Sequence, residues 1–205
     1  MKKFPLFIIS ILGGISISMG GSAFVNAPNE ILSAFLFSLG LFLIFYFKWG
    51  LYTGRVQNLV EVSVKKTAPD LVILYFGNLL GTLCCGYVTR ICSKPQALEK
   101  VEAFVQYKLS LPHLHALILS ILCGIMVYVA VEGFKRIEDP VGKHLAIILP
   151  IMAFIFSGFE HSIANLFFIS LANAWGVEAV IFSAIVAVGN LIGGCVIPLF
   201  HKLVK

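Results

Sequence analysis

Charged residues are scarce in this sequence. Of its 205 residues, 12% are Asp, Glu, Lys or Arg, whereas 59% are hydrophobic and the mean hydropathy is +0.97. Soluble domains typically carry about 25% charged residues, so a soluble enzyme is excluded. A membrane crossing takes roughly 20 residues, and the length therefore allows about six crossings and no separate aqueous domain.

Paired-cysteine and metal-binding motifs are also missing. The sequence has no Cys-x-x-Cys and no His-Glu-x-x-His segment, and we expect no cofactor and no bound metal. An odd number of cysteines favours reduced, packed thiols. The cysteines are Cys84, Cys85, Cys92, Cys123 and Cys195.

The net charge of +5 comes from short basic clusters between apolar runs, which is typical of topology signals and not of a nucleic-acid surface.

Six apolar runs are present, and two of them are interrupted. The second run breaks over residues 48–55 and resumes over 59–64, and the fifth breaks over 158–161 and resumes over 163–174. The sequence therefore predicts an all-α membrane protein with six transmembrane helices, of which helices two and five are broken. The runs cover residues 4–25, 31–47, 70–91, 113–134, 145–156 and 177–200.

The first run follows Lys2 and Lys3 and thus imitates a signal peptide. Its removal would leave five crossings and would break the internal repeat described next. We therefore interpret it as a membrane span.

An internal repeat relates the two halves of the chain. Phe-Gly-Asn-Leu-Leu-Gly at 76–81 is echoed by Val-Gly-Asn-Leu-Ile-Gly at 188–193, and the interruption at 50–53 stands where 158–161 stands in the other half. This predicts a single transmembrane domain over 1–205, with repeats of about 1–92 and about 108–205. Three helices per repeat give an aquaporin-like inverted repeat of three plus three, an architecture typical of transport.

The two interruptions favour one central pathway, because non-helical backbone at membrane depth is tolerated only where protein or a water-filled cavity satisfies its polar groups.

Basic residues gather on one side of the predicted membrane, which predicts that both termini are cytoplasmic. Lys94, Lys100 and Lys108 in the third loop dilute this bias. The basic residues of the first side are Lys2, Lys3, Lys65, Lys66, Lys135, Arg136, Lys143, Lys202 and Lys205.

His161 is the first candidate for chemistry. It lies in the second interruption, and an ionisable group at that depth is costly unless it serves a path. Imidazole titrates near physiological pH and can donate or hold a proton; the alternative is a neutral ring bonded to a backbone carbonyl. We expect Glu160 to brace the interruption and Asn165, one turn later, to orient the imidazole or to pack.

Thr53 stands in the first interruption and offers a hydroxyl that both donates and accepts hydrogen bonds. Asn78 and Asn190 are expected to bond to the interrupted backbone, and the glycines beside them to allow close helix packing. Bulky side chains near these polar groups are able to form narrow apolar constrictions. They are Phe37, Leu41, Leu51, Tyr52, Phe154 and Phe159.

The segment Ser-Gly-Phe-Glu-His-Ser-Ile-Ala-Asn at 157–165 resembles the signature of the formate/nitrite transporter family. Residues 37–41, 51–54 and 189–194 resemble further family segments in the same order. The resemblance implies an aquaporin-like protomer in the cell membrane, assembled as a homopentamer within the lipid bilayer. Each subunit would hold one pore for small monovalent anions such as formate, nitrite or hydrosulfide.

The resemblance also implies individual roles. His161 is similar to the central pore histidine, Thr53 to the loop threonine that faces it, and Lys108 to the vestibule lysine that draws anions toward the pore. Arg55, just after the first interruption, is an unexpected charge, and a tyrosine stands where phenylalanine is more usual. Positions that match the two apolar constrictions are Phe37, Leu41, Leu51, Tyr52 and Phe154.

Two mechanisms and two other function classes stay open. The anion either takes a proton and crosses as a neutral weak acid, or crosses charged with hydrogen bonds from His161 and Thr53. Our hypothesis is the first, with proton exchange at His161 and Thr53. An intramembrane enzyme that uses Glu160 and His161 as acid and base is one alternative, although no nucleophile or metal motif supports it. A membrane scaffold without transport is the other.

Overall fold

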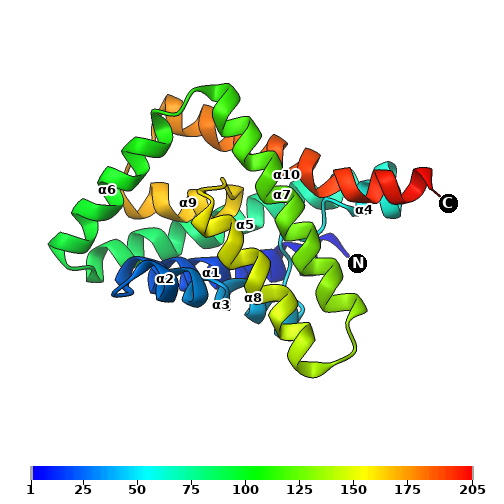
Figure 1. Ribbon diagram of the computed structural model, residues 1–205. Coiled ribbons are helices and arrows are strands. Elements are labelled where there is room, and N and C mark those ends of the chain that lie inside the picture. Colours follow the sequence, from blue (N-terminus) through cyan, green and yellow to red (C-terminus); the bar gives the residue numbers. More distant parts are fainter. Residues whose placement is uncertain (1, 205) are drawn as a thin grey trace.

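The computed structural model describes residues 2–204, and the predicted topology residue Lys205 lies outside this part. The described chain is a bundle of helices without a β-strand, as predicted (Figure 1). The helices are α1 (Lys3–Asn26), α2 (Glu30–Phe37), α3 (Leu39–Phe47), α4 (Asn58–Glu61), α5 (Val64–Cys92), α6 (Pro95–Leu109), α7 (His113–Arg136), α8 (Pro140–Phe156), α9 (Ser162–Leu171) and α10 (Val177–Leu203).

Within residues 2–204, five helical segments are long and apolar enough to cross a membrane. They are α1, α2 together with α3, α5, α7 and α10. The fifth predicted crossing is divided between α8 and α9, which have 17 and 10 residues and are apolar. Between them, five residues are not helical.

Two parts of the chain differ from the sequence prediction. The run 59–64 forms only the single turn α4, because the extended backbone of Ser63 separates it from α5. The predicted loop after α5 contains α6, which starts at Pro95, a residue suited to a first helical turn. Val101, Val105 and Lys108 of α6 are buried, so this helix packs the side that carries these residues against the bundle.

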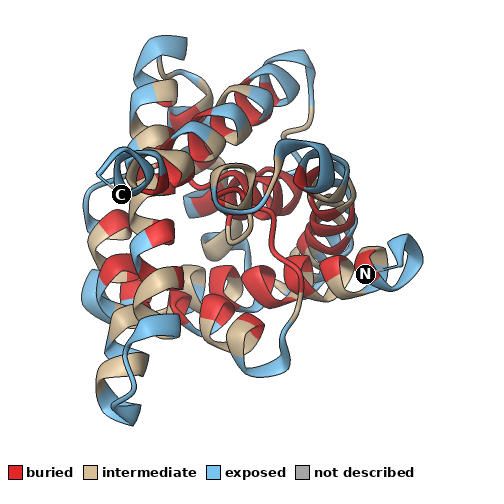
Figure 2. Ribbon diagram, turned by 90° about the vertical axis from the view of Figure 1, so that its right-hand side faces the viewer, coloured by how far each residue is buried: buried red, intermediate tan, exposed pale blue. Residues whose placement is uncertain are grey.

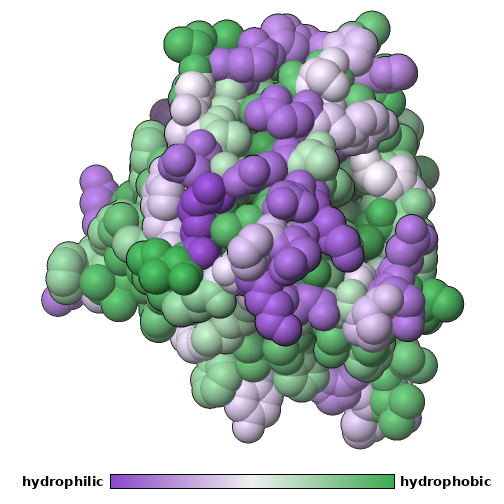
Figure 3. All heavy atoms as spheres, turned by 90° about the vertical axis from the view of Figure 1, so that its left-hand side faces the viewer, coloured by the Kyte–Doolittle hydropathy of each residue, from purple (hydrophilic) through white to green (hydrophobic). Residues whose placement is uncertain are grey.

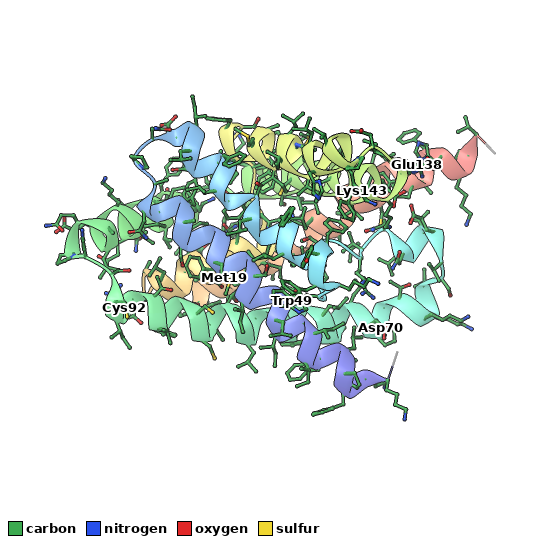
Figure 4. All side chains as sticks on the ribbon, turned by 90° about the horizontal axis from the view of Figure 1, so that it is seen from below. Met19, Trp49, Asp70, Cys92, Glu138 and Lys143 are labelled. Carbon is green, nitrogen blue, oxygen red and sulfur yellow. The ribbon has the colours of Figure 1, made fainter. Side chains whose placement is uncertain are left out.

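The bundle has two distinct ends. Both chain termini lie at one end, called here the terminal end, and α6 covers the opposite end, called the α6 end (Figure 1). Helix α5 connects them, since Cys92 lies near the α6 end and Asp70 near the terminal end, where Glu138 and Lys143 also lie (Figure 4). The α6 end is hydrophilic across its middle and hydrophobic along its lower rim (Figure 3).

The buried residues gather on the faces that the helices turn toward one another (Figure 2). Helix α1 packs along α5, and α7 packs along α10. Both contacts depend on glycine, because a Cβ atom on Gly14 would collide with the carbonyl oxygen of Asn78, and one on Gly124 with that of Asn190. The close approach brings both asparagines to the two interruptions.

Candidate functional site

The break between α8 and α9 places a histidine inside the protein. Gly158 has φ +65°, a left-handed conformation that glycine adopts without strain, and it turns the chain out of α8. His161 is the N-cap of α9, and its Nδ1 accepts a hydrogen bond from the backbone N–H of Ala164 at 3.1 Å. The ring is 4% exposed and stacks on Phe154 with 5.8 Å between ring centres.

The other interruption meets this histidine. Thr53 lies in the non-helical chain between α3 and α4, is 1% exposed, and its Oγ1 lies 3.0 Å from Nε2 of His161. Two segments separated by 108 residues thus meet at a buried hydroxyl and a buried imidazole. The structure brings together the two polar residues that the sequence analysis placed first.

The bond from Ala164 fixes which nitrogen of His161 carries the hydrogen. A backbone N–H only donates, so Nδ1 is an unprotonated acceptor and the neutral ring carries its hydrogen on Nε2. Nε2–H then donates to Oγ1 of Thr53. The Thr53 hydroxyl hydrogen has no acceptor among residues 2–204, and the pair is therefore able to donate one hydrogen bond to a solute.

Asn78 holds the first interruption. Its Nδ2 donates to the carbonyl oxygens of Ser10 at 2.6 Å and Gly50 at 2.8 Å, and its Oδ1 accepts from the backbone N–H of Tyr52 at 2.8 Å. The Gly50 carbonyl and the Tyr52 N–H, which a continuous helix would have satisfied, are satisfied by this buried amide.

Asn190 holds the second interruption in the same way. Its Nδ2 donates to the carbonyl oxygens of Ser120 at 2.8 Å and Glu160 at 2.9 Å, and its Oδ1 accepts from the N–H of Ser162 at 2.8 Å. Each of these partners lies 110 residues after its counterpart around Asn78, which supports the predicted repeat.

The equal offsets correct the register of the two interruptions. Gly50 corresponds to Glu160 and Leu51 to His161, whereas the sequence analysis aligned Thr53 with His161, two residues away. Thr53 therefore reaches the imidazole across the interface of the two halves and not as its symmetry equivalent.

Glu160 ties α6 to the second interruption. Its two carboxylate oxygens accept from Nζ of Lys108 at 2.8 and 2.7 Å, and Oε2 also accepts from Nδ2 of Asn165 at 2.8 Å. Asn165 thus braces Glu160 and does not orient the imidazole. Lys108 is 8% exposed, with Nζ 4.6 Å from the ring centre of Phe104. Its charge is paired with Glu160 inside the protein, whereas the resemblance implied a vestibule lysine that draws anions toward the pore.

Three cavities follow one another past His161. The α6-end cavity (about 80 Å³) and the central cavity (about 10 Å³) share Phe37, Phe154 and His161 in their linings. The central cavity shares Leu41 and Leu51 with the terminal-end cavity (about 310 Å³). The central volume is barely enough for one water molecule. The shared apolar residues form two necks beside the imidazole: Phe37 with Phe154 toward the α6-end cavity, and Leu41 with Leu51 toward the terminal-end cavity.

Tyr52 lies outside this row, in contrast to the prediction that it forms a constriction. Its hydroxyl donates to the carbonyl oxygen of Ala187 at 3.1 Å, and its ring packs on Tyr75. It lines a separate apolar groove of about 620 Å³ between α5 and α10. Phe159 lines the α6-end cavity and not the central one.

Three apolar residues of the central cavity were not predicted, because nothing in the sequence distinguishes them from other helix positions. They are Ile17, Val127 and Ile151.

No group of three or more His, Cys, Asp or Glu side chains within residues 2–204 is arranged to hold a metal ion. A multi-pass helical fold with a row of cavities through its middle defines a membrane channel or transporter.

Comparisons with known proteins place the chain within this class. Residues 1–203 match the family model described as formate/nitrite transporter. The chain is 32% identical over 227 aligned residues to the Uncharacterized transporter YrhG of Bacillus subtilis (strain 168), with 96% of this chain and 85% of that protein covered. It is 26% identical to Formate-nitrite transporter 3 of Toxoplasma gondii (strain ATCC 50611 / Me49) over 93% of its length, and spans 45% of that longer protein.

A solved structure described as a pentameric formate channel with formate bound is also similar. It superposes with a TM-score of 0.83 at 26% identity, and the match covers 98% of this chain and 97% of the other. The chain therefore belongs to the formate/nitrite transporter family, as its motifs predicted. This is a family of membrane transporters and channels, not of enzymes.

Proposed function

We propose that the protein is a channel for small monovalent weak-acid anions, of the formate, nitrite or hydrosulfide type, which pass His161 as neutral acids. The observation that carries this proposal is the central cavity, which the neutral imidazole of His161 lines between two apolar necks, with the buried Thr53 hydroxyl bonded to Nε2 of that ring. The family and the pentameric formate channel support the anion class.

The necks disfavour a bare anion. Moving an unpaired charge through an apolar passage costs several kcal/mol or more, because hydration is lost without replacement. No lysine or arginine lines the central cavity among the described residues. Desolvation favours the uncharged form of an acid, so an anion that enters a neck takes up a proton and crosses as the acid.

His161 and Thr53 then bind the neutral acid. The Thr53 hydroxyl donates to an acid oxygen or sulfur, and the imidazole supports it through Nε2–H. The proton comes from solution, since a second proton on the ring would have to displace the Ala164 N–H from Nδ1. This differs from the expectation of proton exchange at His161, for which the ring would have to leave this capping position.

The wider setting is also a proposal. We place the protein in the cell membrane as a homo-oligomer, a pentamer like the solved formate channel. Both termini are cytoplasmic in this proposal, which is supported by the excess of basic residues at the terminal end and by the positive-inside rule.

Flux measurements on purified protein in liposomes test the function. Formate, nitrite and hydrosulfide are supplied at two external pH values, and uptake is expected to be faster at the lower pH. Protein-free liposomes and the His161→Phe variant, which keeps bulk but removes hydrogen bonding, serve as controls. If no anion enters faster than into protein-free liposomes at either pH, the transport proposal is wrong, and a membrane scaffold without transport is favoured instead.

A further inference from the structure

We infer that Lys48 and Arg55, at the terminal-end cavity, form the site that collects anions for this pathway, and that Arg55 favours small planar oxyanions over hydrosulfide. This inference rests on the proposed function and adds a location and a selectivity to it. It reverses the expectation that Lys108 attracts the anions.

The terminal-end cavity is lined by three basic residues. They are Lys48, Arg55 and Lys135, and none of the lining residues in the described chain is acidic. Lys135 is paired with Glu132 at 2.8 Å. The side chains of Lys48 and Arg55 form no ion pair within residues 2–204, so two positive charges remain uncompensated at this mouth.

The α6-end cavity differs in charge. Its one basic residue, Lys108, is bound to both carboxylate oxygens of Glu160, and this pair is buried. The field of a close ion pair falls off quickly with distance, whereas uncompensated cations around a cleft with apolar walls raise the local concentration of anions. Anions are therefore concentrated at the terminal end.

The two cations are placed beside the path by the first interruption. Lys48 ends α3 in a left-handed conformation with φ 58°, and the backbone N–H of Arg55 donates to the carbonyl oxygen of Tyr52 at 3.0 Å. Arg55 thus follows Thr53 by two residues in a turn that Asn78 anchors through Tyr52. The cavity that it lines begins at Leu51, the residue shared with the neck.

The chemistry of Arg55 suits planar oxyanions. A guanidinium group offers parallel N–H donors whose spacing matches the two oxygens of a carboxylate, and the geometry of nitrite is alike. Hydrosulfide has a single sulfur atom and no second acceptor, so it gains only the electrostatic attraction of the guanidinium charge. Lys48 is a point charge and attracts all three anions without discrimination. Formate and nitrite should therefore gain more from Arg55 than hydrosulfide does.

Concentration-dependent flux in liposomes tests this assignment, with wild type, Arg55→Gln, Arg55→Lys and Lys48→Gln compared at low and high salt. A matched control is Lys66→Gln, which removes one charge from the exposed start of α5 at the same end, outside the cavity. At low salt, Arg55→Gln should raise the half-saturating formate concentration about tenfold, the lower limit for electrostatic focusing. High salt should reduce the difference.

Arg55→Lys retains the positive charge but removes the paired N–H donors. It provides a second test of the assignment if Arg55→Gln does not fold. It should retain the salt dependence and lose the preference for formate over hydrosulfide, whereas Lys48→Gln should weaken both anions alike. Unchanged formate saturation in Arg55→Gln, or an equal effect in Lys66→Gln, would overturn the inference while wild-type flux leaves the proposed function intact. A wild type that conducts no anion overturns both.

Discussion

The two interruptions of this protein share their support and differ in their chemistry. Asn78 and Asn190 make the same three hydrogen bonds to backbone groups that lie 110 residues apart. In sequence, however, the two interruptions differ at equivalent positions: Leu51 corresponds to His161, and Gly50 corresponds to Glu160. The backbone scaffold is thus repeated, whereas the imidazole and the buried carboxylate come from the second half alone. Substitutions at single residues remove one part of this difference or of this likeness.

The buried ion pair exists at only one interruption, and its loss should have the largest effect. Glu160→Gln leaves the Lys108 ammonium buried without a counter-charge, which is expected to destabilise the protein by about 3–5 kcal/mol. Thermal unfolding of purified protein in detergent measures this. The double variant Lys108→Met with Glu160→Gln should recover most of the loss, and a double variant as unstable as the single one would contradict the account.

The two asparagines should be equally important for stability and unequally important for flux. Asn78→Leu and Asn190→Leu each leave buried backbone groups unpaired, at about 1–3 kcal/mol for an unsatisfied group. Similar decreases in unfolding temperature are expected, with a larger decrease in formate flux for Asn190→Leu, because this residue holds the segment that carries His161. Equal flux in the two variants would show that the interruptions contribute alike.

His161→Leu makes the two interruptions chemically alike, since Leu51 occupies the equivalent place. Formate flux should fall at least about tenfold, the equivalent of about 1.4 kcal/mol in the barrier, while the protein stays folded. His161→Asn is the matched control, because asparagine is a good N-cap and its amide donates a hydrogen bond. It should retain more flux than leucine and keep the wild-type pH dependence. Loss of that dependence would identify His161 as the proton source.

The smallest effect is expected at Tyr52. Tyr52→Phe removes the hydrogen bond to the Ala187 carbonyl and should lower stability by about 1 kcal/mol. Flux should be unchanged, because the ring lies outside the row of cavities. A clear change in the flux ratio between formate and hydrosulfide would place this side chain in the path after all.

The sequence predicted those features that depend on local pattern. Hydropathy located the apolar runs, and the paired Gly-Asn segments indicated that buried amides would meet interrupted backbone. Helix α6 was missed because its charges hide a modest apolar spacing, although Pro95 and the spacing of Val101 and Val105 were available as signals.

Other features depend on packing between distant segments. The pairing of Lys108 with Glu160 joins residues 52 positions apart. The direction of the Tyr52 ring is set by dihedral angles of an irregular loop, for which the sequence offers no period. For the same reason, the two-residue difference in register between Thr53 and His161 became visible only through the asparagine contacts.

Internal pH recorded during formate uptake into liposomes tests the central claim most directly. If anions pass His161 as neutral acids, each formate that enters carries a proton. The interior should then acidify in step with formate uptake, and the uptake should be independent of an imposed membrane potential. Formate uptake that follows the membrane potential and leaves the internal pH unchanged would contradict the account.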